Sequence, residues 1–287
     1  MNIWVIGKNG MLAKDILKVF DKNNISYFST GREIDITNID DLNNYIKNKN
    51  IDIVINCAAY TKVDLAEDEP EICAKINGFG VKNISEICEN KNLKLIHFST
   101  DYVFDGTSNK PYKESDTTNP INVYGRSKLE GEKYALSLNK SLIIRISWLY
   151  GINGNNFVYT MLNLMKNKDS IKVVNDQYGS PTNTLDIANL ILHIIKDIKD
   201  FNFGIYHYTN EGNISWFDFA NSIYDLAKKN NILNKDCIVE PCNSKEYKTK
   251  AKRPKFSVLS KDKIKNDYKI NLIDYKESLN SFLKSLA

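Results

Sequence analysis

The segment NIWVIGKNGMLA, residues 2–13, decides the fold, because an apolar strand runs into a glycine turn and a helical pattern follows. Gly7 and Gly10 close the strand and open the helix, and Ala13 supplies a third small residue where helix and strand must pack closely. Such a turn aims backbone N–H groups at a pyrophosphate, whose charge the helix dipole favours. The segment therefore predicts a dinucleotide-binding turn rather than a purely structural one.

Strand-like apolar runs alternate with amphipathic helical patterns through the first half of the chain. This spacing requires right-handed crossovers and gives a parallel sheet covered on both faces. The predicted fold is α/β, a Rossmann-like doubly wound parallel sheet. Strands are expected at residues 2–6, 25–28, 52–55, 93–98 and 141–146, and helices at about 11–21, 39–48, 71–90 and 123–138.

The alternation loosens after Trp148, and clear helical patterns return only at about residues 184–196 and 215–228. We therefore expect a smaller C-terminal substrate-binding domain that is interleaved with late sheet elements. The predicted domain boundaries are residues 1–150 with about 184–208 for the dinucleotide-binding Rossmann domain, and 151–183 with 209–287 for the smaller sugar-nucleotide-binding domain.

Composition argues against several classes of function. The chain of 287 residues is 42% hydrophobic with no apolar run near the roughly 18 residues of a membrane span, and no basic leader precedes the first strand, so a cytoplasmic protein is expected. Five cysteines without a C-x-x-C pair indicate reduced thiols. Three dispersed histidines predict no catalytic metal, and a net charge of +4 with scattered basic residues favours a small anionic ligand over nucleic acid.

The end of the second predicted strand bears on the choice of cofactor. An acidic residue at this point would hold an unphosphorylated ribose, but the chain reads Ser-Thr-Gly-Arg at residues 29–32. The planar fork of Arg32 suits a 2′-phosphate, which favours NADPH. Glu33 and Asp35 lie close enough in sequence to reach the adenosine, so NADH stays an alternative. After the third strand, the small residues 57–59 leave room for a flat cofactor or pack tightly.

Tyr124 and Lys128 stand four residues apart in NVYGRSKLEG, residues 122–131, and so share one face of a predicted helix. A phenol of ordinary pKa, about 10, is a sluggish acid near neutrality. An ammonium about 4 Å away is expected to lower that pKa by up to about 3 units. Ser99 and Thr100 end the fourth strand, at the sheet edge where ligands bind. We expect a hydroxyl at this strand end to bind a substrate carbonyl that Tyr124 protonates, while Lys128 steadies the nicotinamide ribose. The alternative is an incidental surface pair.

Several segments together resemble the extended short-chain dehydrogenase/reductase superfamily. Within it they resemble the dTDP-4-dehydrorhamnose reductase family, over nearly the whole chain. These segments are GKNGMLA, NCAAYTKVD, STDYVFDG, YGRSKLEGE, RISWLYG, DQYGSPT and RPKFSVLS.

The resemblance implies a catalytic triad of Thr100, Tyr124 and Lys128, and a homodimer as one possible assembly. Some members of the family are magnesium-linked dimers, but the sequence does not identify acidic ligands for such an ion, so no metal site is assigned. In the predicted substrate contacts, Trp148 covers the sugar or the base and Arg253 suits a diphosphate. The predicted cofactor contacts are Gly7, Gly10, Met11, Leu12, Arg32, Asp35, Ile36, Cys57, Ala58, Ala59, Tyr60, Ser99, Tyr124 and Lys128. The predicted substrate contacts are Thr61, Val63, Asp101, Tyr102, Trp148, Asn156, Gln177 and Arg253.

The implied activity is the NADPH-dependent reduction of the C4 ketone of dTDP-4-dehydro-L-rhamnose to dTDP-L-rhamnose. One alternative is another nucleotide-sugar reductase or an epimerase of the same superfamily. Dehydratases carry an Asp-Glu pair after the fourth strand, and Asp101 followed by Tyr102 argues against dehydration. Another alternative is a non-catalytic NADP-binding regulatory subunit, like the β subunit of methionine adenosyltransferase, because fold alone does not decide function.

Overall fold

A six-stranded sheet forms the centre of the computed structural model, which describes residues 1–196 and 201–286. Its strand order is β10-β5-β4-β3-β1-β2, and every neighbouring pair is parallel. The predicted doubly wound α/β fold is confirmed. The strands are β1 (Ile3–Ile6), β2 (Tyr27–Thr30), β3 (Ile53–Asn56), β4 (Lys94–Thr100), β5 (Ser141–Ile146) and β10 (Gly204–His207).

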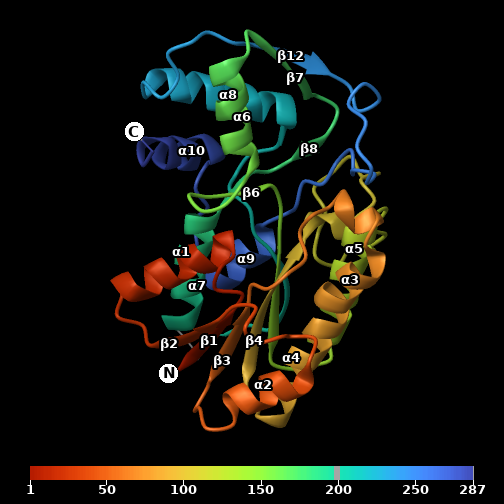
Figure 1. Cartoon of the computed structure of the whole chain (residues 1–287), viewed down its shortest axis with the longest axis vertical. Helices are drawn as coiled ribbons and strands as arrows, with labels where there is room; N and C mark the ends of the chain where they lie inside the picture. The colour runs from red at the N-terminus through yellow and green to blue at the C-terminus, as the bar shows by residue number, and fades with distance from the viewer. Residues whose placement is uncertain (197–200, 287) are drawn as a thin grey trace.

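Helices cover both faces of the sheet, as Figure 1 shows. Side chains alternate along β1, so that Ile3 and Val5 enter the core on one face while Trp4 and Ile6 enter the core on the other. The first core is covered by α1 (Met11–Lys22), α7 (Thr184–Lys196) and α9 (Asp262–Tyr268). The second is covered by α2 (Ile39–Ile46), α4 (Gly80–Asn90) and α5 (Val123–Leu136).

The helix predicted at residues 71–90 is interrupted, so that prediction was wrong in part. It consists of α3 (Pro70–Ala74), a π-helical turn η2 (Lys75–Phe79) and α4. In the π-helical turn, the side chain of Asn77 bonds both backbone groups of Tyr60 at 2.8 and 3.0 Å and donates to Ser127 Oγ at 3.0 Å. The π-helical turn thereby connects the loop after β3 to α5. No periodic pattern in the sequence predicts this connection.

The second strand begins two residues later than predicted, and β10 is not among the five predicted strands. Asn24 is left-handed at φ 53° and Ile25 N–H bonds Phe20 O at 3.0 Å, so residues 25 and 26 still belong to the turn after α1. β10 reads Gly-Ile-Tyr-His, so a glycine and a histidine replace the uninterrupted apolar run that identifies β1. It lies within the range predicted for the Rossmann domain, but the division into two domains stays a prediction, and residues 197–200 and 287 lie outside the described part.

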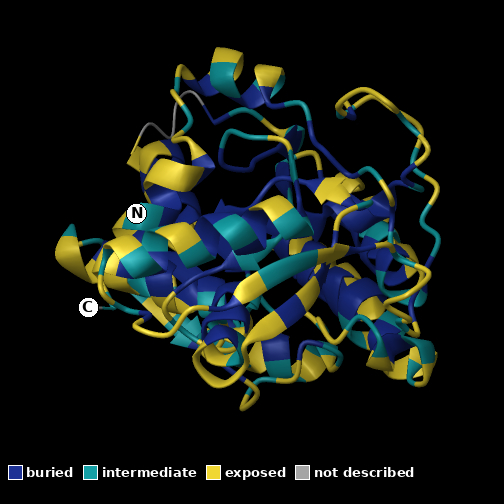
Figure 2. Ribbon diagram, turned by 90° about the horizontal axis from the view of Figure 1, so that it is seen from above, coloured by how far each residue is buried: buried dark blue, intermediate teal, exposed yellow. Residues whose placement is uncertain are grey.

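A separate aromatic core lies above the sheet in Figure 1, around Tyr150, Phe219 and Phe282. Figure 2 shows the buried segments in dark blue running through the interior beneath exposed outer helix faces. No helix in residues 1–196 or 201–286 is long and apolar enough to cross a membrane. The remaining elements are η1 (Leu65–Glu67), η3 (Asp101–Val103), β6 (Leu149–Tyr150), α6 (Phe157–Asn167), β7 (Ser170–Val174), β8 (Tyr178–Gly179), β9 (Thr182–Asn183), β11 (Ile214–Ser215), α8 (Trp216–Lys229), β12 (Ile238–Cys242) and α10 (Tyr275–Lys284).

Candidate active site

A cleft of about 550 Å³ opens at the carboxyl ends of the central strands, between the sheet and the aromatic core. Ligands of open α/β sheets bind at this edge. The structure brings most of the predicted site residues into the cleft lining. They are Gly10, Met11, Leu12, Cys57, Ala58, Ala59, Thr61, Val63, Ser99, Thr100, Asp101, Tyr102, Tyr124, Lys128, Trp148 and Arg253.

The glycine turn has the shape that a pyrophosphate requires. Gly7 is left-handed at φ +87°, and a Cβ there would lie 2.7 Å from the backbone nitrogen of Ala58. Gly10 is the N-cap of α1 and has no side chain to occupy the N–H groups of the first helical turn. Any larger residue at position 7 would collide with the backbone of the segment that follows β3. The residues present therefore fit a dinucleotide here.

The end of β2 differs from the predicted cofactor site. Arg32 is exposed, whereas Glu33 accepts Lys8 Nζ at 2.5 Å and Gly31 N–H at 2.9 Å. The hydrogen bond from Lys8 lowers the pKa of Glu33 to about 2. The Asp35 carboxylate accepts the N–H and hydroxyl of Thr37 at 2.9 and 2.8 Å, so it closes a local turn. Both carboxylates are thus engaged within the protein, and contacts of Arg32, Glu33 or Asp35 with a cofactor stay predictions.

Several predicted residues lie outside the cleft lining. Tyr60 is bonded to Asn77 and to Glu69, and Ile36 is buried in the sheet core. Asn156 caps α6 by accepting Tyr159 N–H at 3.2 Å. Gln177 donates to Ser244 Oγ at 2.9 Å. Cofactor or substrate contacts by these residues stay predictions. The full set is Gly7, Arg32, Asp35, Ile36, Tyr60, Asn156 and Gln177.

Tyr124 and Lys128 occupy the first two turns of α5. Asn122 caps the helix by accepting Gly125 N–H at 2.7 Å, and its amide donates to Lys252 O at 2.8 Å. A Cβ on Gly125 would collide with the carbonyl of Tyr102, so this glycine lets α5 approach the end of β4 closely. The helix is thereby fixed with both side chains in the cleft lining.

The ammonium of Lys128 is fixed within the floor of the cleft. Its side chain is 3% exposed, and Nζ donates to Phe98 O on β4 at 2.6 Å. Burial lowers the pKa of Lys128 to about 8, although the nearby Glu132 acts in the opposite direction. The position of the ammonium is therefore fixed by a backbone contact, and within the described residues Lys128 forms no ion pair.

The predicted lowering of the Tyr124 pKa was wrong for the protein without ligand. Burial raises the pKa of this phenol above its usual value, and the charge of Asp101 adds to that increase. The nearby Thr100 hydroxyl acts in the opposite direction. Lys128 does not offset the burial, because its ammonium is directed to the Phe98 carbonyl. The phenol is therefore held protonated, as a proton donor must be.

The strand end that carries Thr100 also carries buried polar groups without partners. Ser99 Oγ and Asp101 Oδ2 have no hydrogen-bond partner within the described residues, and both residues line the cleft. Thr100 Oγ1 lies 3.1 Å from Asp101 Oδ1 and accepts Tyr102 N–H at 3.2 Å. Burial raises the pKa of Asp101 to about 7. Unpaired buried polar atoms are rare, and these two belong to residues of the cleft lining.

Arg253 reaches the cleft from the late part of the chain. Its guanidinium donates to Tyr102 OH at 2.9 Å and to Asp64 Oδ2 at 2.8 Å. The arrangement fixes a partly exposed cation beside the catalytic strand end, although Asp64 neutralises much of its charge.

Trp148 is left-handed at φ 48° and lies face to face with Trp216, with ring centroids 3.5 Å apart at 8°. Gly179 has no side chain to displace the Trp148 ring. Eight lining residues were not predicted from the sequence. For Trp216, nothing in the segment WFDFA, residues 216–220, distinguishes a cleft residue from a core residue. Most of the remaining ones lie at or just after the ends of predicted strands, where ligand contacts were expected. The missed lining residues are Asn56, Phe98, Ile146, Ser147, Leu149, Asn155, Phe157 and Trp216.

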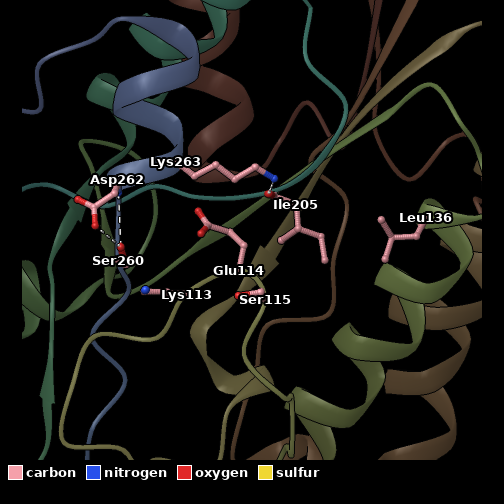
Figure 3. A pocket seen from close by; sticks show the side chains of 8 residues that line it. All are labelled: Lys113, Glu114, Ser115, Leu136, Ile205, Ser260, Asp262 and Lys263. Carbon is pink, nitrogen blue, oxygen red and sulfur yellow. Dashed lines mark hydrogen bonds between the residues drawn. The ribbon is translucent and has the colours of Figure 1, made fainter.

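A second hollow, of about 640 Å³, contains none of the predicted site residues (Figure 3). It lies along the free edge of β10, where Lys263 Nζ donates to Ile205 O at 2.7 Å and Glu114 Oε1 accepts His207 N–H at 3.1 Å. Side chains that occupy edge backbone groups prevent pairing with another strand. The side chains that line this hollow protect the sheet edge. The cleft contains most of the predicted site residues, so the cleft is the candidate active site.

Comparison with known proteins agrees with this geometry. The chain matches the family described as RmlD substrate binding domain over residues 1–287. It is 40% identical to a dTDP-4-dehydrorhamnose reductase of Aggregatibacter actinomycetemcomitans over 281 residues, covering 96% of each chain. A reductase structure of the same name from Clostridium acetobutylicum aligns with a TM-score of 0.93 at 40% identity, covering 100% of this chain and 99% of that one. Another, from Bacillus anthracis in complex with NADP, aligns with a TM-score of 0.92 at 36% identity, covering 99% of each. With a fold, a cleft and a full-length match that all agree, the chain belongs to the RmlD substrate binding domain family.

Proposed function

We propose that this chain reduces the C4 ketone of dTDP-4-dehydro-L-rhamnose to dTDP-L-rhamnose with NADPH as the reductant. The observation that carries the proposal is the convergence of Thr100, Tyr124 and Lys128 on one cleft with the glycine turn. The names of the full-length relatives support the substrate, and the NADP complex of the Bacillus anthracis relative supports the cofactor. When bound, NADPH supplies the hydride.

The side chains of the cleft supply the rest of the chemistry. Tyr124 donates its proton to the ketone oxygen as the alcohol forms, and Thr100 offers a hydroxyl to the same oxygen. Lys128 lines the same cleft with its ammonium on Phe98 O. Its charge acts on a developing phenolate only when bound ligands exclude water from the cleft, because charges interact more strongly there. Tyr124 is therefore proposed to act as the acid in the complex with ligands, although burial raises its pKa.

The sugar nucleotide is proposed to lie between the strand ends and the aromatic core. Thr61, Val63 and Tyr102 line the near side of the cleft, while Trp148 lines the far side. Arg253 is suited to the diphosphate, which would compete with Asp64 for its guanidinium. The indole of Trp148 offers a flat apolar surface to the sugar or the base.

A direct assay tests this function. Purified protein is mixed with NADPH and dTDP-4-dehydro-L-rhamnose, and absorbance at the nicotinamide band is followed while the product is identified by NMR. A panel of dTDP-, UDP- and GDP-linked keto-sugars shows which nucleotide and which sugar are preferred. Absorbance that stays constant with every keto-sugar would rule out the reductase.

The rival functions differ in what they would show. An epimerase would retain its dinucleotide through purification, whereas a reductase must release and rebind it at each turnover. A non-catalytic NADP-binding subunit would bind the cofactor and a partner synthetase without turnover. Loss of turnover in Tyr124→Phe with intact cofactor binding argues against the regulatory subunit.

Two finer properties complete the proposal. We place the protein in the cytoplasm, and the five cysteines support this because all are free thiols in the described structure. We also propose a homodimer, for which the exposed Ile72 and Phe79 of α3 and η2 provide an apolar surface. Light scattering of the purified protein measures the assembly, and a monomer at micromolar concentration would contradict this proposal.

A further inference from the structure

Asp101 carries a buried carboxyl group that the proposed chemistry does not use. It is 2% exposed, and Oδ2 has no hydrogen-bond partner within the described residues. Oδ1 has a single side-chain partner, the hydroxyl of Thr100 at 3.1 Å. Ser257 lies beside the carboxyl and favours its ionised form, yet its hydroxyl is oriented toward Tyr178 O at 3.4 Å. An ionised carboxylate with so few donors is costly in an apolar interior, whereas a neutral carboxylic acid is not.

The protonation of Asp101 determines where the hydrogen of Thr100 points. A hydroxyl has one hydrogen and two lone pairs, and Tyr102 N–H occupies one lone pair of Thr100 at 3.2 Å. An ionised Asp101 can only accept, so it takes the hydrogen and leaves none for a ketone oxygen. A protonated Asp101 donates to the second lone pair instead. The hydrogen of Thr100 is then free to point into the cleft.

The same change affects Tyr124. The charge of an ionised Asp101 raises the pKa of Tyr124. A neutral Asp101 removes this effect, so Tyr124 is a better acid when Asp101 carries a proton. The single hydrogen of Thr100 meanwhile stays available for the ketone oxygen.

We propose that Asp101 is a positioning residue whose proton directs the Thr100 hydroxyl into the cleft, and that the reductase is active in the form with neutral Asp101. The inference rests on the proposed function. Asp101 keeps its proton throughout the reaction, and the proton consumed in each reduction comes from Tyr124. No group beyond those of the proposed reaction is needed.

The pH dependence of turnover follows from the groups around Asp101. Thr100 of β4, Tyr102 of η3 and Tyr124 of α5 face it, and from the late segment Ser257 lies beside it while Arg253 reaches the Tyr102 hydroxyl. Because the pKa of Asp101 is raised to about 7, the fraction with neutral Asp101 decreases as pH rises through that value. We therefore expect kcat/KM, which reports the free enzyme, to fall over the same range.

The test compares Asp101→Asn with Asp101→Leu. An Asn amide is neutral at every pH and can donate to Thr100, so Asp101→Asn should keep kcat/KM within about threefold of wild type near pH 6 and lose the fall near pH 7. Leu offers no donor, so Asp101→Leu should lose about tenfold or more. In a Thr100→Val background the two substitutions should have equal effects, because there is no hydroxyl to direct. NADPH binding and thermal unfolding of each variant show that the cleft is intact.

Equal losses in the Asn and Leu variants, or an unchanged fall near pH 7 in Asp101→Asn, would overturn the inference. A second measurement does not depend on turnover. Infrared spectra of the wild type should contain a protonated carboxyl band that disappears as pH rises through about 7 and is missing from Asp101→Asn. Absence of that band near pH 6 also overturns the inference. A wild type that shows the band but reduces no keto-sugar would instead contradict the proposed function.

Discussion

The two walls of the cleft are built by different means. Thr100, Tyr124 and Lys128 form the polar wall, and they lie at the end of β4 or in the first two turns of α5. Backbone groups contact the side chains of Thr100 and Lys128. Trp148, Phe157 and Trp216 form the aromatic wall, where an indole stack holds one residue in a left-handed conformation. From this difference we expect regular structure to position the proposed proton transfer and side-chain packing to govern the proposed substrate recognition. Loss of a polar group should therefore lower kcat, and loss of an aromatic ring should raise KM.

Removal of the Tyr124 hydroxyl from the polar wall should have the largest effect on turnover. Tyr124→Phe should lower kcat by about 10²- to 10⁴-fold, because the ketone loses its proton donor. The NADPH dissociation constant, measured by fluorescence titration, should not change. Tyr134→Phe is the matched control on the same helix, since Tyr134 bonds only the exposed Glu130. A Tyr124→Phe enzyme with near-normal kcat would show that the acid is another group.

Asp101, next to Thr100 of the polar wall, should make the free energy of unfolding depend on pH. The pKa of Asp101 rises from 3.8 to about 7 on folding, so the folded state binds more protons than the unfolded state between these values. The free energy of unfolding of the wild type should therefore fall as pH rises from about 4 to about 7, by at most about 4 kcal/mol, and stay low above that range. Asp101→Asn has no carboxyl group to ionise at this position, so it should be more stable than the wild type at about pH 8. Urea unfolding across the pH range measures the difference.

Asp186 provides the control for this measurement. It is also a buried carboxyl, but Asn210 and Ser278 donate to it at 2.7 and 2.5 Å. Asp186→Asn should destabilise the protein by about 1–3 kcal/mol because the amide disrupts satisfied hydrogen bonds. Destabilisation of Asp101→Asn by a similar amount at about pH 8 would mean that the Asp101 carboxyl is satisfied in solution.

The aromatic wall should respond to truncation through binding. Trp216→Ala frees Trp148 from its stacked partner and should raise KM for the keto-sugar by an amount equivalent to about 1–3 kcal/mol, with kcat nearly unchanged. Steady-state kinetics measure both constants. Phe217→Ala is the matched control, because Phe217 packs against the aromatic core but does not line the cleft. A loss confined to kcat would show that the aromatic wall positions the reacting atoms.

The smallest effect is expected outside both walls. Arg32 is exposed near the end of β2, so Arg32→Ala should weaken NADPH binding by about 1 kcal/mol and leave NADH binding unchanged. Binding titrations with the two cofactors give the ratio of affinities. Arg126→Ala, on the exposed side of α5, controls for the loss of one positive charge. Equal changes for both cofactors would mean that Arg32 does not contact the 2′-phosphate.

Sequence reasoning was most successful where local chemistry determines local structure. The glycine turn and the strand ends are specified by small residues and by alternating apolar patterns, so the sheet and the polar wall could be predicted. The π-helical turn depends on the contact of Asn77 with Tyr60 and Ser127, two residues from other elements. Such contacts over long sequence separation leave no periodic pattern.

The direction of the Tyr124 pKa shift could not be predicted for a similar reason. Helical spacing places Lys128 beside Tyr124, but the direction of its ammonium depends on the carbonyl of Phe98. The neighbour of Trp148 is Trp216, from a segment 68 residues later in the numbering. Helical and strand patterns identify which residues share an element, whereas long-range packing determines which of them meet in the cleft.

The edge position of β10 has a consequence for the order of synthesis. β10 completes the sheet beside β5, and Trp216 and Arg253 follow it in the chain. A ribosome releases the N-terminal segments first, and these include the glycine turn, Thr100 and Tyr124. An unfinished polypeptide thus carries Tyr124, the proposed proton donor, before it has Trp216 and Arg253 on the far side of the cleft. The cleft lining is complete only after Arg253 has been synthesised.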